Sequence, residues 1–167
     1  MELVPYTDAD QWLTEALETD HRVMAELGGP WPLERIPEIH RRRLGYIAKG
    51  AWYLKVVPDP GGPAVGAVGV WHSEVNGQEL SEMAWMILPE HQGRGHASAA
   101  VRLLLERIRT DGSWGDVHAF PGITNGPSNA ICRKVGFELV GQIEVDYGGR
   151  MLRCNHWVLR AGTDRDG

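Results

Sequence analysis

Features that would assign this protein to a secreted or membrane class are missing from its sequence. The 167 residues include only two cysteines, too few for a disulfide framework. No stretch approaches the ~18 apolar residues of a membrane span, and the acidic start at residues 1–6 lacks the apolar run of a signal peptide. We therefore expect a protein of the reducing cytoplasm with no membrane partner.

Positive charge and metal-binding patterns are also scarce. The net charge is −5, whereas a protein that binds duplex nucleic acid needs a basic face. His91, His96, His118 and His156 show no ligand spacing with cysteine or carboxylate partners. We expect no nucleic-acid partner and no metal. The acidic balance is compatible with an amine substrate, although it suits neutral ligands equally well.

Turn residues and hydrophobic periodicity predict an α+β protein, an α/β arrangement in three layers. Strands are expected at 3–6, 51–57, 64–75, 79–88, 116–120, 137–146 and 151–160. Helices are expected from an N-cap at Asp8 to about residue 27, at about 33–49, from 97 to the glycine at 112, and at 125–135. We expect one domain over 1–160, with a central mixed, mostly antiparallel sheet flanked by helices, and a polar tail at 161–167.

The most informative segment is a glycine-rich loop between the strand at 79–88 and the helix at 97–108. It consists of Gln92, Gly93, Arg94, Gly95, His96 and Ala97. The first N–H groups of a helix have no partner inside it, and the helix dipole favours negative charge there. The glycines let the backbone approach a ligand closely, and Arg94 can add a charged contact. The loop predicts a phosphate or pyrophosphate site, with a purely structural turn as the alternative.

The same loop nearly matches the fingerprint of dinucleotide-binding proteins. However, Ser98 stands where the third small residue belongs, and no acidic strand-end residue follows about twenty positions later. The Gly-Lys-Ser/Thr ending of a Walker loop is also missing. A nicotinamide-dependent oxidoreductase is therefore a remote alternative.

Two motifs about thirty residues apart resemble those of the GNAT superfamily of acetyl-CoA-dependent N-acetyltransferases. The closer likeness is to the branch that includes the ribosomal-protein N-terminal acetyltransferases. The first motif comprises the strand residues Glu82, Met83, Ala84 and Trp85, then Pro89, Gln92, Gly95 and Ala97. The second comprises Asn125, Ser128, Lys134, Gly136 and Phe137. The motifs cover about residues 79–141.

The resemblance implies a cofactor and its site. Acetyl-CoA would place its pyrophosphate on the loop from Gln92 to Ala97. Its pantetheine arm would pair with the main chain at about Met86 and Ile87, where two strands of the sheet splay apart. Asn125 and Ser128 would contact the cofactor or a bound water, while capping of their own helix is the alternative.

The resemblance also implies catalytic residues. Glu82 matches the glutamate of the branch and would accept the proton of the attacking amine, directly or through water; the alternative is a solvated carboxylate at a strand end. Cys132 stands where many relatives carry a tyrosine that protonates the leaving thiolate. A thiol can donate only weakly, so Cys132 is either that acid or a small buried packing residue.

The predicted activity is transfer of an acetyl group from acetyl-CoA to a primary amine by direct attack in a ternary complex. The acceptor is expected to be a small-molecule amine or a protein N-terminus. A module that binds acyl-CoA but has lost catalysis is the alternative. A homodimer is left open.

Overall fold

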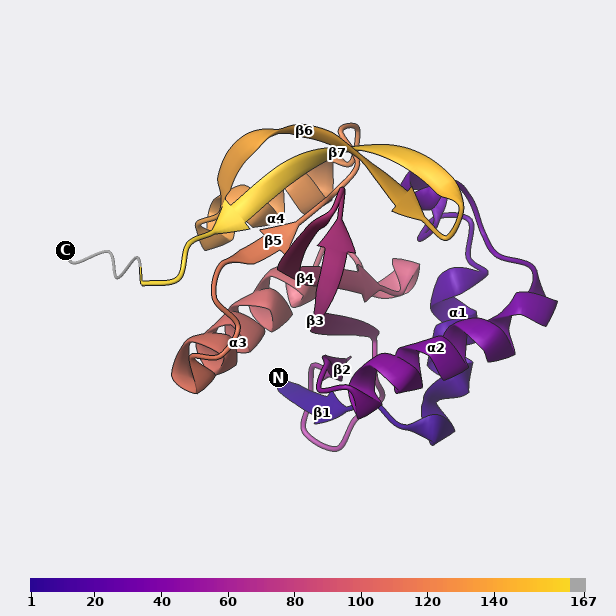
Figure 1. The fold of residues 1–167 in the computed structure, drawn as a ribbon. Coiled ribbons are helices and arrows are strands. Elements are labelled where there is room, and N and C mark those ends of the chain that lie inside the picture. Colours follow the sequence, from indigo (N-terminus) through magenta and orange to yellow (C-terminus); the bar gives the residue numbers. More distant parts are fainter. Residues whose placement is uncertain (163–167) are drawn as a thin grey trace.

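The computed structural model describes residues 1–162, and its centre is a seven-stranded sheet with the order β1-β2-β3-β4-β5-β7-β6 (Figure 1). The neighbouring strands run antiparallel except β4 and β5, which are parallel. The predicted fold class, a mixed and mostly antiparallel sheet flanked by helices, is confirmed. The strands are β1 (Glu2–Pro5), β2 (Trp52–Val57), β3 (Gly66–Val75), β4 (Gln78–Ile87), β5 (Val117–Ala119), β6 (Glu138–Tyr147) and β7 (Arg150–Leu159).

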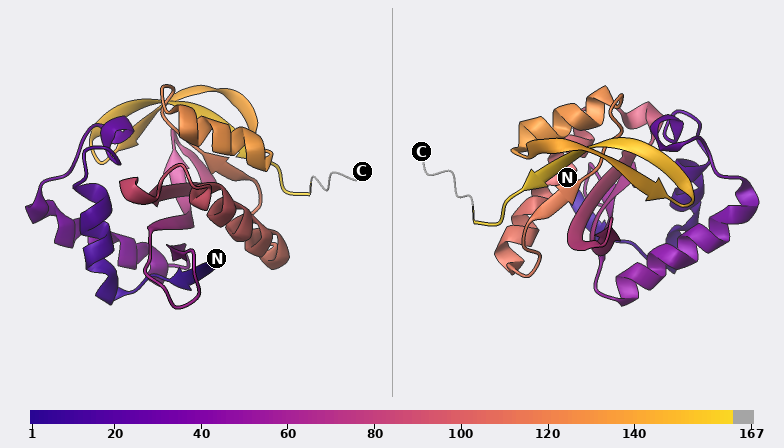
Figure 2. Two further views of the ribbon diagram at one scale, coloured as in Figure 1. Left: turned by 180° about the vertical axis from the view of Figure 1, so that it is seen from behind. Right: turned by 45° about the horizontal axis from the view of Figure 1, so that its top comes forward.

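Helices cover both faces of this sheet. The helices α1 (Gln11–Glu18) and α2 (Ile36–Ala48) lie on one side of the molecule, and α3 (His96–Asp111) and α4 (Gly126–Val135) lie on the other (Figure 2). Short 3₁₀ turns occupy Asp8–Asp10, Ala25–Leu27, Leu33–Arg35 and Pro89–His91. None of the helices in the described range is long and apolar enough to cross a membrane.

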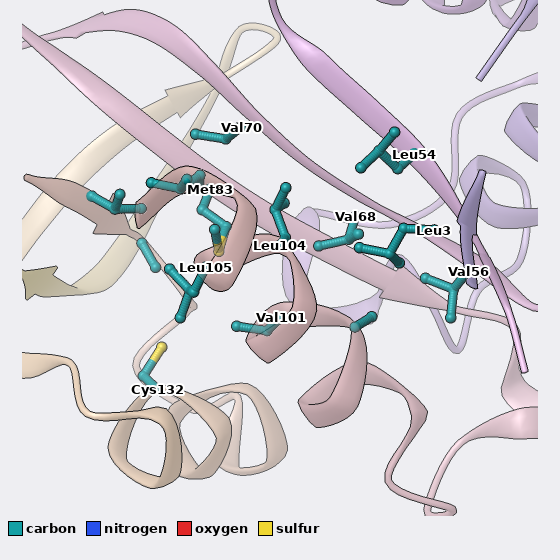
Figure 3. Close-up of a cluster of buried hydrophobic side chains, with 14 of the residues drawn as sticks. Leu3, Leu54, Val56, Val68, Val70, Met83, Val101, Leu104, Leu105 and Cys132 are labelled. Carbon is teal, nitrogen blue, oxygen red and sulfur yellow. The ribbon is translucent and has the colours of Figure 1, made fainter. Parts of the chain in front are cut away.

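The main core lies between the sheet and α3. The 3.6-residue period of α3 buries Val101, Leu104 and Leu105 against Val70 and Met83 of the central strands (Figure 3). A smaller cluster on the opposite face contains Leu13 and Leu17 of α1, together with Tyr6, Ala67 and Leu88. The two clusters fix α1 and α3 to opposite faces, so each can contribute one wall to a site at the sheet.

The first helix is shorter than predicted, and its cap is different. It ends at Glu18, and the chain then turns before the 3₁₀ turn at Ala25–Leu27. The side chain of Asp20 accepts the backbone N–H of Arg22 at 2.8 Å, a local bond that competes with helix formation. Asp8 is not the N-cap. It lies inside a 3₁₀ turn whose start is capped by Thr7 and Asp10, with the Thr7 N–H donating to Asp10 at 2.7 Å.

The sheet opens between β4 and β5. These strands pair only at Ser81 with Val117 and at Glu82 with His118. β5 ends at residue 119, whereas β4 continues to Ile87 with β3 as its partner on the other edge. One edge of β4 beyond Glu82 is therefore free of a neighbouring strand within residues 1–162.

Candidate functional site

A cleft of about 1200 Å³ lies where β4 and β5 separate. One end is lined by the loop before α3 and the start of α4, and the other end by α1, α2 and the tip of the β6–β7 hairpin. The hairpin arches over this region (Figure 1). Most of the sequence-predicted site residues line the cleft, namely Glu82, Met86, Ile87, Gln92, Gly93, Gly95, His96, Ala97, Asn125 and Ser128.

The glycine loop presents unbonded backbone donors at the mouth of the cleft. Gly93 and Gly95 have φ angles of +72° and +80°, which turn the chain sharply into α3. The first backbone bond after the turn runs from Ala99 N–H to the Gly95 carbonyl at 3.0 Å. No acceptor for the N–H groups of residues 93–98 is found in the part of the chain that the structure describes. Such a set of donors at a helix N-terminus suits a phosphate or pyrophosphate.

The side chains of the loop contribute less than its backbone. Gln92 donates from its amide to the carbonyl of Ile87 at 2.8 Å, which fastens the loop to the end of β4. Arg94 is exposed and does not line the cleft. A phosphate contact from Arg94 therefore stays a prediction.

The open edge of β4 is offset by one residue from the sequence prediction. Leu88 donates its N–H to Val65 at 2.8 Å, on the β3 side. Main-chain groups of successive residues in a strand point to opposite edges, so those of Met86 also face β3. The groups that face the opening belong to Trp85 and Ile87. Met86 is thus wrong as a main-chain partner for an extended ligand, although its side chain lines the cleft.

Glu82 lies on the floor of the cleft, at the last pairing of β4 with β5. The Ser73 hydroxyl of β3 donates to Glu82 Oε2 at 2.8 Å. Burial raises the pKa of the Glu82 carboxyl, and the Ser73 hydrogen bond offsets part of that rise. A carboxylate with a raised pKa in a cleft is a candidate general base.

Cys132 does not reach the cleft. Its side chain has no solvent exposure and packs in the main core, beside Leu105 (Figure 3). Burial raises the pKa of its thiol to about 12. The structure contradicts the general-acid reading, because a thiol sealed in the core cannot protonate a leaving group in the cleft.

Asn125 and Ser128 line the cleft, and Asn125 also caps α4. The Asn125 side chain accepts the Ser128 N–H at 3.1 Å, as an N-cap residue does. The neighbouring Asn129, which the sequence did not single out, ties this helix to β7. Its side-chain oxygen accepts hydrogen bonds from Asn155 and from Trp157, both at 2.8 Å. A cofactor contact of Asn125 and Ser128 stays a prediction.

Aromatic and charged side chains that the sequence analysis missed form the far end of the cleft. Tyr53 stacks on Trp71 with ring centroids 5.6 Å apart, and Trp71 is the ladder partner of Glu82. Tyr147 of β6, together with Glu18 and Arg43 of α1 and α2, completes this end. Of the residues that the sequence analysis missed, only Trp71 and the Glu82 partner Ser73 could have been found from the sequence. The Asn76-Gly77 turn fixes the hairpin register and therefore predicts that they lie near Glu82.

The roof over this far end is tied together by one arginine. Arg150 at the start of β7 donates to the carbonyl of Gly29 at 2.5 Å and to that of Leu27 at 3.1 Å. Its guanidinium lies 3.5 Å from the ring centroid of Trp31. The loop after α1 and the hairpin tip are therefore joined above the cleft.

Comparison with known families gives the family of the chain. The model of the acetyltransferase (GNAT) domain matches residues 1–138. The chain belongs to this family. It is thus an acetyltransferase by family, as its two motifs predicted. No curated protein matches the sequence.

Solved structures agree on the fold of this GNAT domain. Spermidine N-acetyltransferase from Vibrio cholerae, solved with CoA and spermine, superimposes with a TM-score of 0.76 at 20% identity, over 96% of this chain and 95% of that one. Ribosomal-protein-alanine N-acetyltransferase from Brucella melitensis gives 0.77 at 21%, over 96% and 99%. An acetyltransferase from Salmonella typhimurium, solved with acetyl-CoA, gives 0.76 at 18%, over 100% and 97%. The spermidine and ribosomal-protein enzymes are equally similar, so the predicted branch stays a prediction.

Proposed function

We propose that this protein is an N-acetyltransferase that uses acetyl-CoA and a primary amine. The observation that carries the proposal is the position of Glu82, a largely buried carboxylate where β4 and β5 separate, next to a loop of unbonded N–H groups. In the solved relatives from Vibrio cholerae and Salmonella typhimurium, the ligands are CoA with spermine and acetyl-CoA respectively. The same type of cofactor suits the donors of this cleft.

The backbone holds the cofactor. The N–H groups of residues 93–98 bind the pyrophosphate, because a dianionic group satisfies several unpaired donors at once. The open edge at Trp85 and Ile87 offers main-chain groups to the peptide-like pantetheine arm, as a strand would. Since the Ile87 carbonyl already accepts from Gln92, its N–H and the groups of Trp85 remain for this pairing.

Glu82 removes the proton that makes the amine unreactive. An alkylammonium has a pKa of about 10 and is mostly charged at neutral pH. Bound acetyl-CoA supplies a thioester whose carbonyl carbon the neutral amine attacks, so that a C–N bond forms as the C–S bond breaks. Glu82 takes the amine proton directly or through water, and an N–H at the open edge of β4 stabilises the developing oxyanion. The second proton, which the nitrogen loses as the amide forms, passes through solvent to the leaving thiolate, since Cys132 is sealed in the core and supplies no side-chain acid.

The test has two stages. Calorimetric titration with acetyl-CoA, with NADH as the control ligand, should show saturable binding of acetyl-CoA alone. Glu82→Gln should then lower kcat by about 10²- to 10⁴-fold and leave acetyl-CoA affinity unchanged, because the base contributes to proton transfer and not to cofactor binding. Glu79→Gln, at an exposed carboxylate of the same strand, should have no effect. Absence of acetyl-CoA binding would refute the cofactor site, and unchanged turnover of Glu82→Gln would remove Glu82 as the base.

A further inference from the structure

A second carboxylate, Glu18, lies buried at the far end of the cleft. Only 1% of its surface is exposed. Its Oε1 accepts a hydrogen bond from Arg43 at 2.7 Å. Its Oε2 has no donor among residues 1–162. A buried carboxylate oxygen without a donor is rare in folded proteins and marks a position where a ligand can supply one.

Glu18 cannot easily turn toward another donor. Arg43 holds one of its oxygens and also donates to the Thr14 hydroxyl at 3.2 Å, while Thr14 bonds to the His40 ring at 2.9 Å. These residues come from α1 and α2, which pack against each other. The orientation of Oε2 is therefore set before any ligand arrives.

Tyr53 connects this carboxylate to the reacting end of the cleft. The Arg43 guanidinium lies 4.9 Å from the centroid of the Tyr53 ring, and that ring also stacks on Trp71, which lies opposite Glu82. Burial raises the pKa of the Tyr53 hydroxyl, which also experiences the charges of Arg43, Glu18 and Glu82. An acceptor whose amine meets Glu82 would therefore extend along Tyr53 toward Glu18.

The charges around Glu18 favour a neutral donor over a second ammonium group. Arg43 already neutralises Glu18, and Arg42 also lines the cleft. Burial raises the pKa of the Tyr147 hydroxyl, which lies in the same region. The charges of Glu18, Arg43 and Arg42 also act on this hydroxyl. Glu18 and Arg43 together carry no net charge. An ammonium group at Oε2 would add an unpaired charge where Glu18 is only 1% exposed, whereas a hydroxyl or amide N–H would add none.

We propose that Glu18 Oε2 accepts a hydrogen bond from a neutral donor on the distal part of the acceptor. The preferred acceptor is then a primary amine that carries a hydroxyl or an amide N–H, and not a plain alkylamine or a diamine. This inference rests on the proposed function, since the acceptor enters the same cleft.

The test compares acceptors matched in length with the unmodified protein. Alkylamines, amino alcohols, amino amides and diamines are assayed with acetyl-CoA over a series of chain lengths. The best neutral-donor amine should exceed its matched alkylamine in kcat/KM by about 10- to 100-fold, because the unmatched amine leaves Oε2 buried without a donor. Equal values for all classes, or the highest value for a diamine, would overturn the inference while leaving the acetyltransferase function intact. No turnover with any amine would refute the proposed function as well.

Glu18→Gln provides the matching variant. Its carbonyl oxygen can keep the bond to Arg43, which places the amide N–H₂ where Oε2 lies. An amide N–H on the acceptor then meets another donor, whereas a hydroxyl can rotate and accept from the N–H₂. The variant should raise KM for the amino amide about tenfold or more and leave the alkylamine unchanged. Glu15→Gln, at an exposed position of α1, is the control. Acetyl-CoA affinity and thermal unfolding show whether the variant is folded, and if it is not, the comparison of acceptors decides alone.

Discussion

Removal of the Ser73 hydroxyl should raise the pKa of Glu82 and thereby weaken catalysis below neutral pH. Burial already raises this pKa, and the 2.8 Å bond from Ser73 opposes the rise. A hydrogen bond to a charged group contributes about 1.5–3 kcal/mol, and one pKa unit corresponds to about 1.4 kcal/mol. Ser73→Ala should therefore raise the pKa of Glu82 by about one to two units. A base acts only when deprotonated, so the acid limb of the rate profile should move to higher pH by the same amount.

The assay is the pH dependence of kcat/KM with a saturating level of acetyl-CoA, which reports the ionisation of the enzyme before the amine binds. Ser73→Thr keeps the hydroxyl on a strand residue and should leave the limb where it is. At a pH above the acid limbs of both the variant and the unmodified protein, Ser73→Ala should turn over at nearly the rate of the unmodified protein. An acid limb that does not move in Ser73→Ala, in a variant that still binds acetyl-CoA, would refute Glu82 as the titrating base.

Two further substitutions test the loop and the core. Gly95→Val should abolish acetyl-CoA binding measured by calorimetry. A φ of +80° is strained for valine by about 1–2 kcal/mol, so the loop must rearrange. The control is Gly112→Val at the other end of α3, where φ is +75°; this variant should lose stability but keep its affinity for acetyl-CoA. Cys132→Ala should leave kcat unchanged and lower the free energy of unfolding by about 1 kcal/mol, measured in urea, whereas a large fall in kcat would restore the cysteine as the acid.

The glycine loop and the strand before it, which carry the first motif, could be predicted from the sequence. The loop from Gln92 to Ala97 is a local structure: a strand, two glycines and a helix start determine it without help from distant residues. The alternation of β4 is equally local, since Met83 packs in the core while its neighbour Glu82 faces the cleft. Local geometry of this kind depends on backbone preferences that each residue carries with it.

The errors arise where a distant element decides. Met86 was chosen for main-chain pairing from a resemblance, but the edge to which a strand residue points depends on the partner strand, here through the Leu88 bond to Val65. For Cys132 the motif left open a general acid or a small buried packing residue, because which face of α4 is buried depends on the packing of that helix against α3. Neither partner can be identified from the residue's neighbours in sequence.

The acceptor end of the cleft depends entirely on such long-range packing. Glu18 and Arg43 are separated by 25 positions, and each alone resembles a solvated charge on an amphipathic helix. Only the docking of α1 and α2 beside β2 buries them together, and only the hairpin of β6 and β7 closes the space above Tyr53. The phosphate-binding loop is thus encoded in one contiguous segment, whereas the acceptor end is assembled from several. Substrate preference can therefore change through substitutions in α1, α2 or the hairpin without any change in the acetyl-CoA motif.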